Sequence, residues 1–467
     1  MLKYIFLISI ILIPSAKAQQ VNPSLDNAGI KILWFDQKLD HFNDGDKRTW
    51  QMRYMVNEKY FKPNKTIYLF LGGESTILSP NTNASNIMLT NSLMHDAAQK
   101  NAGYLIHTEH RFYGESKPTA ELSLDDLKFL SSRQALADVA ALIRSLKSDI
   151  SRFGNSKLFV VGGSYSGILV PWFAKLYPDL IDRGWASSAP FQFHLEYERY
   201  NIIVARTLEQ IGGQECYRRL QNGTEKLANY LNDKDQIEEA MRLLNICNKF
   251  NVNNDFALWN VYHKMALVFG TLVQFNTGTN IQAVCKEILQ GSNDVEAVSQ
   301  YIVKQLKDKS QKCIDYSFKT RVENHKILKY TTDSERLWTY QRCKEFGNFP
   351  TSEKRYKDMT NKIPLKYFIR TCYMVFGEQF TRERIKENVQ RTNAIFKHLH
   401  DENRPKGNIF FTRASLDPWV EVGLQNNSMA VLLKDASHCE DLRPIGPHDS
   451  KQMRAFKESI LAAAAVL

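Results

Sequence analysis

The chain has 467 residues, which is enough for one large domain with an insertion or for two domains. Hydrophobic residues make up 43% of it and aromatic residues 11%, proportions that are ordinary for a globular protein with a sizeable core. The formal net charge is +11, but lysine and arginine are scattered along the chain rather than clustered in a patch, which argues against a nucleic-acid-binding protein.

Residues 1–18 have the layout of a secretory signal peptide. A basic start at Lys3 is followed by an apolar run from Tyr4 to Ile13 and by small residues that end at Ala18, the predicted cleavage site. This run is too short to cross a bilayer, which needs about 20 apolar residues, and no other segment of the sequence is suited to it. We therefore expect a chain without a membrane anchor that is secreted or reaches the endosomal–lysosomal route. Four sequons are compatible with N-glycosylation on that route: Asn64, Asn83, Asn222 and Asn426.

From residue 66 to residue 190, short β-rich runs alternate with helical stretches. Residues 130–150 carry apolar side chains at helical spacing, and residues 168–180 also read as a helix. Continuous apolar strands between amphipathic helices are typical of a parallel sheet covered on both faces. The strands are expected within residues 66–74, 103–115, 157–163 and 183–190.

The character of the chain changes near residue 192. Charged helical stretches with few strand signals continue to about residue 330, and strand patterns then return in residues 407–415 and 429–437, before a closing helix. We predict an α/β domain in two parts, residues 19–191 and 331–467, interrupted by a mostly helical insertion, or cap, of residues 192–330.

The seven cysteines lie far from the N-terminus, and six of them fall between residues 216 and 372. The sequence contains no C-x-x-C pair, so neither a zinc ribbon nor a thioredoxin-type site is suggested. In an oxidising compartment these six cysteines could staple the cap with three bridges, although 15 connectivities are open.

Residues 159–167, FVVGGSYSG, join the end of a predicted strand to the start of a predicted helix. The nucleophile elbow of α/β-hydrolases has the pattern strand, Gly-x-Ser-x-Gly, helix, with the serine on a strained turn that excludes bulky neighbours. The segment around Ser164 meets this pattern with one departure, since Ser166 stands where the second glycine is usual. A glycine–serine turn after a strand is common by itself, but the flanking strand and helix favour a nucleophile.

A nucleophilic serine needs a histidine to take its proton and an acid to orient that histidine. In α/β-hydrolases the acid and the histidine follow the serine in that order. Asp417 comes just after the predicted strand of residues 407–415, and His438 just after that of residues 429–437. Either residue alone would be read as an ordinary turn or surface residue. Their order and their common placement after strands predict a triad of Ser164, Asp417 and His438.

The same chemistry requires an oxyanion hole. We expect it to pair the backbone N–H of Tyr165 with an N–H from the glycine loop Gly72–Ser75, which includes Glu74 and follows an early strand. The alternative reading of this loop is an ordinary tight turn. Acyl transfer of this kind requires no metal and no organic cofactor.

Several motifs together resemble the prolyl carboxypeptidase family of serine exopeptidases, which also includes lysosomal dipeptidyl peptidases and the thymus-specific serine protease. The resemblance extends from residue 34 to residue 443, and the glycine loop and FLSSRQALADV look most like the thymus-specific branch. It implies an α/β-hydrolase fold with a helical insertion, the triad above, and cleavage of peptides near a chain terminus, typically after proline. The motifs are EHRFYGES, FLSSRQALADV, GGSYSG, ASSAP, LDPW and SHCEDLR.

The resemblance also implies roles for individual residues. Trp419 in LDPW is either a wall of an apolar pocket for proline or a core aromatic residue. Arg443 either lies close to His438 and biases its charge or forms a structural ion pair with Glu440 or Asp441. By family-like spacing we expect disulfides between Cys216 and Cys285, Cys247 and Cys313, and Cys343 and Cys372, which leaves Cys439 free.

Three positions depart from the family's pattern. Cys439 stands where relatives often have a second histidine, and Ser75 and Ser166 each stand where glycine is frequent. None of these departures removes a triad member, so we expect activity to be retained.

The sequence leaves several alternatives open. A carboxypeptidase needs a cation for the substrate carboxylate, whereas a dipeptidyl peptidase needs an acid for the substrate amine, and the sequence does not decide between them. A lipase or esterase shares the fold and the triad, and a non-enzymatic binding protein would require an unreactive Ser164. We expect short peptides as substrates, and whether the chain forms a homodimer is not readable from the sequence.

Overall fold

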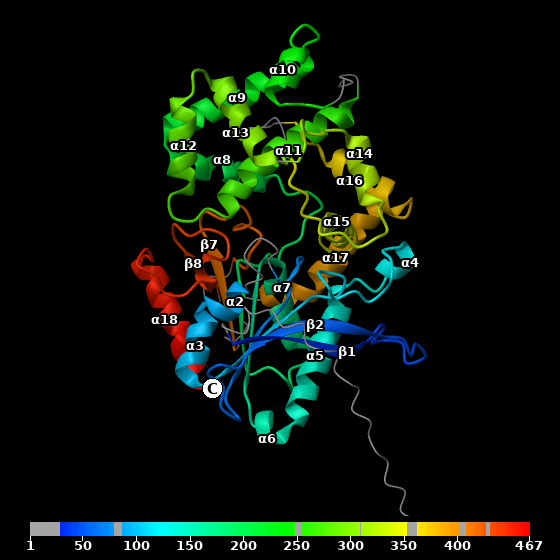
Figure 1. The fold of residues 1–467 in the computed structure, drawn as a ribbon, viewed down its shortest axis with the longest axis vertical. Helices are drawn as coiled ribbons and strands as arrows, with labels where there is room; N and C mark the ends of the chain where they lie inside the picture. The colour runs from blue at the N-terminus through cyan, green and yellow to red at the C-terminus, as the bar shows by residue number, and fades with distance from the viewer. Residues whose placement is uncertain are drawn as a thin grey trace, which may run out of the picture.

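The computed structural model describes residues 29–78, 86–247, 254–308, 310–352, 362–400, 408–425 and 430–467. The predicted signal peptide and the sequons at Asn83 and Asn426 lie outside these residues. The described chain forms two lobes, one built around a sheet and one built of helices (Figure 1).

In the described residues the strands form one sheet of eight, in the order β1-β2-β4-β3-β5-β6-β7-β8. β1, β2 and β4 are antiparallel neighbours, and every later pair in the order is parallel. The strands are β1 (Ile30–Lys38), β2 (Thr49–Asn57), β3 (Ile67–Phe70), β4 (Tyr104–Thr108), β5 (Leu158–Gly163), β6 (Arg183–Ser187), β7 (Ile409–Ala414) and β8 (Ala430–Leu433).

The predicted α/β-hydrolase fold is confirmed, with one addition at the edge of the sheet. β3 to β8 lie within the runs that the sequence predicts, but the antiparallel pair β1 and β2 was not predicted. β1 forms the outer edge, and its burial alternates irregularly because it carries Lys31, Asp36 and Gln37 among its apolar residues. A strand of that kind lacks the continuous apolar run that marks the buried strands.

Helices cover both faces of the sheet because successive strand residues point to opposite sides. Leu69 and Val160 lie in one apolar cluster with residues of α5 (Ser132–Ser148) and α7 (Ser164–Leu176). Their neighbours Tyr68 and Phe159 lie in a second cluster with residues of α3 (Leu93–Asn101) and α18 (Lys451–Ala465). On that second face Trp185 of β6 packs against Phe456 of α18, with ring centroids 5.8 Å apart. This packing holds β5 and its C-terminal end rigidly between two helical layers.

Between β6 and β7, all the regular elements in the described part of the chain are helical. They form the upper lobe of Figure 1, with α15 and α17 next to the sheet. The predicted boundary at residue 330 falls between α14 and α15, well before β7, and the division into domains stays a prediction. The elements are α8 (Arg199–Gly212), α9 (Gln214–Asn232), α10 (Ile237–Leu243), α11 (Asp255–Gln274), α12 (Asn280–Gln290), α13 (Asp294–Leu306), α14 (Phe318–His325), α15 (Glu335–Gln341), the π-helical turn η1 (Arg342–Phe346), α16 (Leu365–Phe376), α17 (Arg382–Phe396) and the 3₁₀ turn η2 (Lys397–His400).

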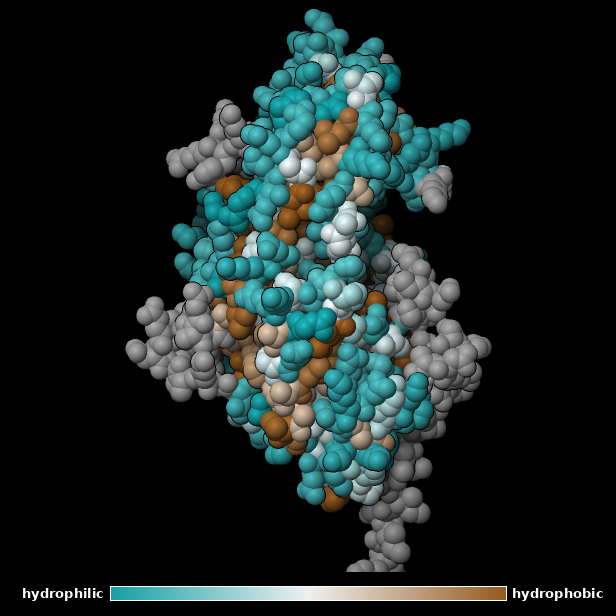
Figure 2. All heavy atoms as spheres, turned by 90° about the vertical axis from the view of Figure 1, so that its left-hand side faces the viewer, coloured by the Kyte–Doolittle hydropathy of each residue, from teal (hydrophilic) through white to brown (hydrophobic). Residues whose placement is uncertain are grey.

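Short helices complete the sheet lobe: α2 (Ile87–Thr90), α4 (Leu124–Leu127), α6 (Ile150–Phe153) and the 3₁₀ turn η3 (Glu440–Leu442). None of the described helices is both long and apolar enough to cross a membrane. On the side of the molecule seen in Figure 2, hydrophilic residues cover most of the surface and hydrophobic residues show between them in small groups.

Disulfides tie the helical lobe together at three places among the described residues. They join Cys216 to Cys285, Cys247 to Cys313 and Cys343 to Cys372, the same pairs that the resemblance implied, and Cys439 is free. The first links α9 to α12, and the third links η1 to α16. The third therefore fixes the part of the helical lobe that lies nearest the sheet.

Candidate active site

Ser164 lies at the sharp turn between β5 and α7. Its φ of 55° is in the left-handed region, which costs energy for a residue with a side chain. The turn is also crowded: a Cβ on Gly162 would lie 2.1 Å from the carbonyl oxygen of Ser166, and one on Gly167 would lie 2.8 Å from Cβ of Ala189. The glycines are therefore required by the backbone, and the strained residue is the serine, as expected for a nucleophile elbow.

Ser166 braces this turn from inside. Its hydroxyl accepts a hydrogen bond from the N–H of Gly163 at 3.0 Å and donates one to the carbonyl of the same residue at 2.9 Å. The side chain is buried, with 7% exposed. The departure from glycine at this position is thus structurally accommodated.

Asp417 and His438 form a buried pair beyond the ends of β7 and β8. The Nδ1 atom of His438 lies 2.7 Å from Oδ2 of Asp417, and the other carboxylate oxygen accepts the backbone N–H of Trp419 at 2.9 Å. Burial alone would lower the pKa of His438, but the charge of Asp417, with a smaller contribution from Cys439, raises it well above its ordinary value. The imidazole is therefore oriented by a carboxylate through its Nδ1 atom.

The strand register places this pair beside the elbow. Gly163 of β5 aligns with Ser187 of β6, and Ala414 of β7 aligns with Leu433 of β8, so the parallel strands end along one edge. The loop that carries His438 touches the elbow, because a Cβ on Gly163 would lie 2.9 Å from Sγ of Cys439. In the described residues no hydrogen bond joins Ser164 to His438, and such bonds often tighten only when substrate is bound.

The predicted oxyanion loop packs directly against the elbow. A Cβ on Gly72 would lie 2.3 Å from the carbonyl of Thr108, so the loop needs a glycine there, and the Cβ position of Gly73 faces Cβ of Ser166 at 3.9 Å. Glu74 lines the same cavity as Ser164, whereas Ser75 is exposed and is not among the lining residues. Burial raises the pKa of Glu74.

Tyr165, whose backbone N–H is the other predicted oxyanion donor, is held by its side chain. Its hydroxyl lies 2.8 Å from Nε2 of His110, 3.1 Å from Oγ of Ser132 and 2.9 Å from Nε2 of Gln341. Ser132 in turn donates to Glu345 at 3.1 Å. These contacts connect the residue after the nucleophile to α5, α15 and η1, and sequence reasoning did not find them.

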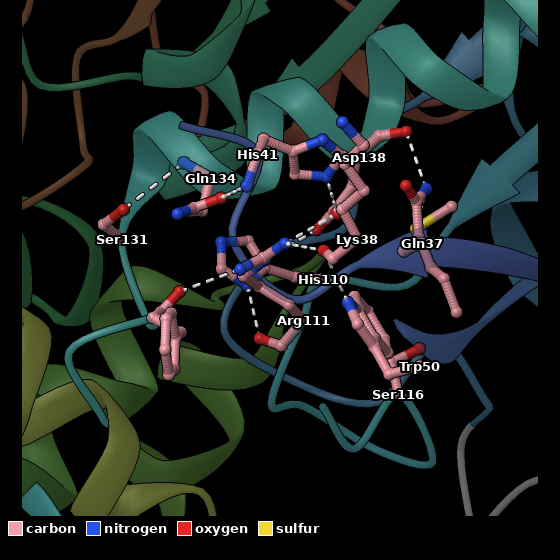
Figure 3. A network of polar contacts seen from close by, with 12 residues as sticks. Gln37, Lys38, His41, Trp50, His110, Arg111, Ser116, Ser131, Gln134 and Asp138 are labelled. Carbon is pink, nitrogen blue, oxygen red and sulfur yellow. Dashed lines mark hydrogen bonds and ion pairs between the residues drawn. The ribbon is translucent and has the colours of Figure 1, made fainter. Parts of the chain in front are cut away.

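A second polar network lies behind His110 (Figure 3). Arg111 donates to both carboxylate oxygens of Asp138 at 2.7 Å each, and His41 Nε2 lies 2.7 Å from the same carboxylate. Both partners of the arginine–aspartate pair are almost fully buried. The pair is therefore fully hydrogen-bonded, and it fixes the segment from which His110 reaches Tyr165.

A cavity of about 350 Å³ opens above the elbow, between the sheet and the helical lobe. Trp419 is one of its walls, stacked on Tyr197 with ring centroids 5.6 Å apart and an interplanar angle of 16°. The pocket reading of Trp419 is thus compatible with the structure. Aromatic and aliphatic lining residues include Ile168, Phe193, Tyr200, Trp338, Phe346 and Phe349.

Gln274, at the C-terminal end of α11, connects the helical lobe to the loops that carry Trp419 and His438. Its carbonyl accepts the backbone N–H of His438 at 3.2 Å. Its side-chain oxygen accepts both the indole N–H of Trp419 and the hydroxyl of Tyr200, each at 3.1 Å. No sequence signal marked this residue, because its partners lie in three separate segments of the chain.

Arg443 differs from both predictions made for it. It is exposed, and within the described ranges it forms no ion pair with Glu440 or Asp441 and no polar contact with His438. Asp441 is instead buried behind the sheet, where its carboxylate accepts hydrogen bonds from Ser187 and Thr412, each at 2.5 Å. Asp441 is therefore bonded to the hydroxyls of Ser187 in β6 and Thr412 in β7, and not to Arg443.

Among solved structures, the chain is similar to the proline iminopeptidase of Mycobacterium smegmatis, with a TM-score of 0.38 and 10% identity over 92% of this chain and 99% of that one. It is also similar to an esterase of Pyrobaculum calidifontis, with a TM-score of 0.35 and 10% identity over 95% of this chain and 87% of that one.

Proteins related in sequence are more similar to this chain than the solved structures are, and they match over most of its length. The thymus-specific serine protease of Homo sapiens is 30% identical over 457 residues, which cover 92% of this chain and 85% of that protein. The lysosomal Pro-X carboxypeptidase of Homo sapiens is 27% identical over 436 residues, which cover 88% of this chain and 83% of that protein.

The family match spans nearly the whole chain. Residues 37–460 match the family described as serine carboxypeptidase S28. The resemblance inferred from the sequence motifs is thereby confirmed, and with it the expectation of a serine-type peptidase. The chain belongs to the serine carboxypeptidase S28 family.

Proposed function

We propose that this protein is an exopeptidase that hydrolyses short peptides after proline, with Ser164, His438 and Asp417 as its catalytic triad. The observation that carries the proposal is the buried Asp417–His438 pair, 2.7 Å apart, at the edge of the sheet where the strained Ser164 begins α7. One cavity brings Ser164 together with an apolar wall that includes Trp419.

The geometry supports an acyl-enzyme mechanism. Ser164 attacks the scissile carbonyl while His438 accepts its proton, which the leaving amine then receives. Asp417 holds the imidazole in the correct tautomer and stabilises the imidazolium. The backbone N–H of Tyr165, together with an N–H from the Gly72–Ser75 loop, stabilises the oxyanion, and water finally releases the acyl group.

The proposed preference for proline rests on the shape and chemistry of the cavity. Aromatic side chains form a substantial part of its wall, and a compact apolar ring such as that of proline packs favourably against them. The human Pro-X carboxypeptidase is a relative over most of its length, which supports the same preference.

Mass spectrometry of products from short peptides tests the proposal. Peptides with an internal proline should be cleaved after that residue, at one bond near a terminus, and the Ser164→Ala variant should not cleave them. Cleavage of p-nitrophenyl esters without any cleavage of peptides would instead indicate an esterase. Turnover by Ser164→Ala at the wild-type rate would overturn the assignment of the nucleophile.

We further propose that the protein acts outside the cell or in the endosomal–lysosomal route. Disulfides form and persist in oxidising compartments, and the structure has three.

Of the two sequons in the described residues, Asn64 is exposed, whereas Asn222 lies within α9 and donates to Asp294 at 3.2 Å. We therefore expect a glycan at Asn64, which an Asn64→Gln variant would lack in intact-mass measurements of the secreted protein.

A further inference from the structure

The cavity beside Ser164 contains ionisable side chains as well as aromatic ones. Glu74, Arg321, Glu335 and Arg342 all line it. A charge inside such a cavity is costly unless it has a partner of opposite charge. The pairing of these four side chains therefore indicates which charged group of a substrate the cavity can accept.

The two acids differ in their partners. Glu335 is paired with Arg321 at 3.0 Å, and its other oxygen lies 3.6 Å from Nε2 of His325. Burial raises the pKa of Glu74, which makes its charged form less favourable in the cavity than in water. A substrate ammonium group would therefore meet one acid that is already paired and another whose charged form is disfavoured by burial.

Arg342, by contrast, lacks an anionic partner. Its Nε and Nη2 atoms donate to the carbonyls of Gly347 and Asn348 at 3.3 and 2.9 Å, and its guanidinium lies over the ring of Phe349 at 4.7 Å. It forms no ion pair with any carboxylate in the described part of the chain. Burial, together with the nearby charge of Arg321, lowers the pKa of Arg342 to about 10.

The local backbone holds this arginine in place. Arg342 begins η1, and the next residue, Cys343, is bonded to Cys372 of α16. Gly347 ends the turn with a φ of 60°, and a Cβ there would lie 2.5 Å from the carbonyl of His194. A guanidinium fixed by such a backbone, by two carbonyls and by an aromatic ring is already oriented before a ligand binds.

A second unpartnered polar group lies in the same wall. His263 of α11 lines the cavity, is 9% exposed, and its Nδ1 atom has no hydrogen-bond partner. The ring centroids of His263 and Phe368 are 5.4 Å apart, and the guanidinium of Arg342 lies 5.8 Å from that same phenylalanine ring. A cation and a polar ring therefore flank Phe368, and each has hydrogen-bonding capacity to spare.

We propose that Arg342 binds the free α-carboxylate of the peptide substrate, so that the enzyme removes residues from the C-terminus. The assignment rests on the proposed function of Ser164. A guanidinium has five N–H donors and matches a carboxylate in a fork geometry, and Arg342 uses only two of them on carbonyls. During cleavage the leaving amine takes the proton from His438 while its carboxylate stays on Arg342, and water then hydrolyses the acyl-enzyme.

The test compares one proline-containing peptide in three forms: with both termini free, with an amidated C-terminus, and with an acetylated N-terminus. The wild type should prefer the free acid to the amide by roughly ten- to hundred-fold in kcat/KM, mainly through KM, because a charged hydrogen-bonded contact is lost in the amide. Acetylation of the N-terminus should change little.

Two variants and one control assign the effect to the side chain. In Arg342→Gln the ratio of kcat/KM for the free acid to that for the amide should fall to near one, while fluorophosphonate labelling reports whether Ser164 is still reactive. Arg342→Lys should restore part of the preference, because it keeps the charge but not the fork. The matched control is Arg443→Gln, which removes an exposed arginine that does not line the cavity.

Several outcomes would overturn the assignment. Equal wild-type rates on the acid and the amide would do so, as would the wild-type preference persisting in both Arg342 variants. Release of N-terminal dipeptides, abolished by acetylation, would show that the cavity binds the free α-amine of the substrate and not its α-carboxylate. Absence of fluorophosphonate labelling in the wild type would overturn the proposed function itself, and the role of Arg342 with it.

Discussion

At the residue scale, the contact between Asp417 and His438 determines how the site responds to pH. Asp417 is 1% exposed, so its charge acts on the imidazole with little screening by solvent. That charge outweighs burial and raises the pKa of His438 well above its ordinary value. Because a general base must be neutral to accept a proton, kcat/KM should rise as the pH increases through this raised pKa.

Replacing Asp417 tests whether its charge sets the pKa of His438. In Asp417→Asn the charge is gone, so the pKa of His438 should fall and the acid limb of the profile of kcat/KM against pH should move to lower pH. The rate at the optimum should fall by roughly 10⁴-fold, because the amide no longer stabilises the correct tautomer and the imidazolium. Asp435→Asn, a change of an exposed acid in the turn before His438, is the control. An unchanged acid limb in Asp417→Asn would contradict this account of His438.

At the scale of the element, the β5–α7 turn depends on the absence of side chains at its glycines. In Gly162→Ala the new Cβ would lie 2.1 Å from the carbonyl of Ser166, so the turn must distort. We expect loss of fluorophosphonate labelling and a lower melting temperature. Gly446→Ala, where no atom lies within 4 Å of the new Cβ, should change neither. Normal labelling of Gly162→Ala would mean that the elbow tolerates a different backbone.

The end of α11 is a second element whose position matters for catalysis. Gln274→Ala leaves the partly buried indole N–H of Trp419 and the hydroxyl of Tyr200 without their shared acceptor, at a cost of about 1–3 kcal/mol. We expect a higher KM for peptides, because Trp419 is a wall of the cavity. Gln290→Ala, at the exposed end of α12, should leave the kinetics unchanged. Steady-state kinetics of both variants check this, and an unchanged KM in Gln274→Ala would remove Gln274 as a positioning residue.

At the scale of the whole molecule, the helical lobe sits over the sheet edge that carries the proposed triad, and a cavity of about 350 Å³ lies beside Ser164. A cavity of this size admits a few residues of an extended peptide but not a folded domain. The enzyme should therefore cleave short peptides efficiently and leave the interior of folded proteins intact. Mass spectrometry after incubation with a folded protein and with its unfolded peptides measures the difference, and internal cleavage of the folded form would contradict the role of the lobe.

The predictions from the sequence agree best with the structure for features that depend on local residue patterns and on the order of motifs along the chain. Strands β3 to β8 and the placement of Ser164, Asp417 and His438 after strands follow from apolar runs and glycine turns, which are short-range signals. The antiparallel edge strand β1 was missed because its polar residues resemble a loop.

The contacts around the triad were beyond sequence reasoning for a related reason. Gln274, Gln341 and Arg342 are ordinary polar residues on helices, and nothing local distinguishes them from solvent-facing ones. Their importance arises only when the helical lobe folds back onto the sheet edge and places them against Trp419, Tyr165 and the cavity. The three residues of the proposed triad could thus be named from the sequence, whereas the side chains that surround them could be identified only from the fold.

The most direct test of the central claim is covalent labelling of the purified protein with a fluorophosphonate, followed by mass spectrometry of its peptides. The account predicts one stoichiometric adduct on Ser164, which is absent in Ser164→Ala and is formed much more slowly in a His438→Ala variant. An adduct on another residue, or none on a protein that still cleaves peptides, would contradict the assignment of Ser164 as the nucleophile.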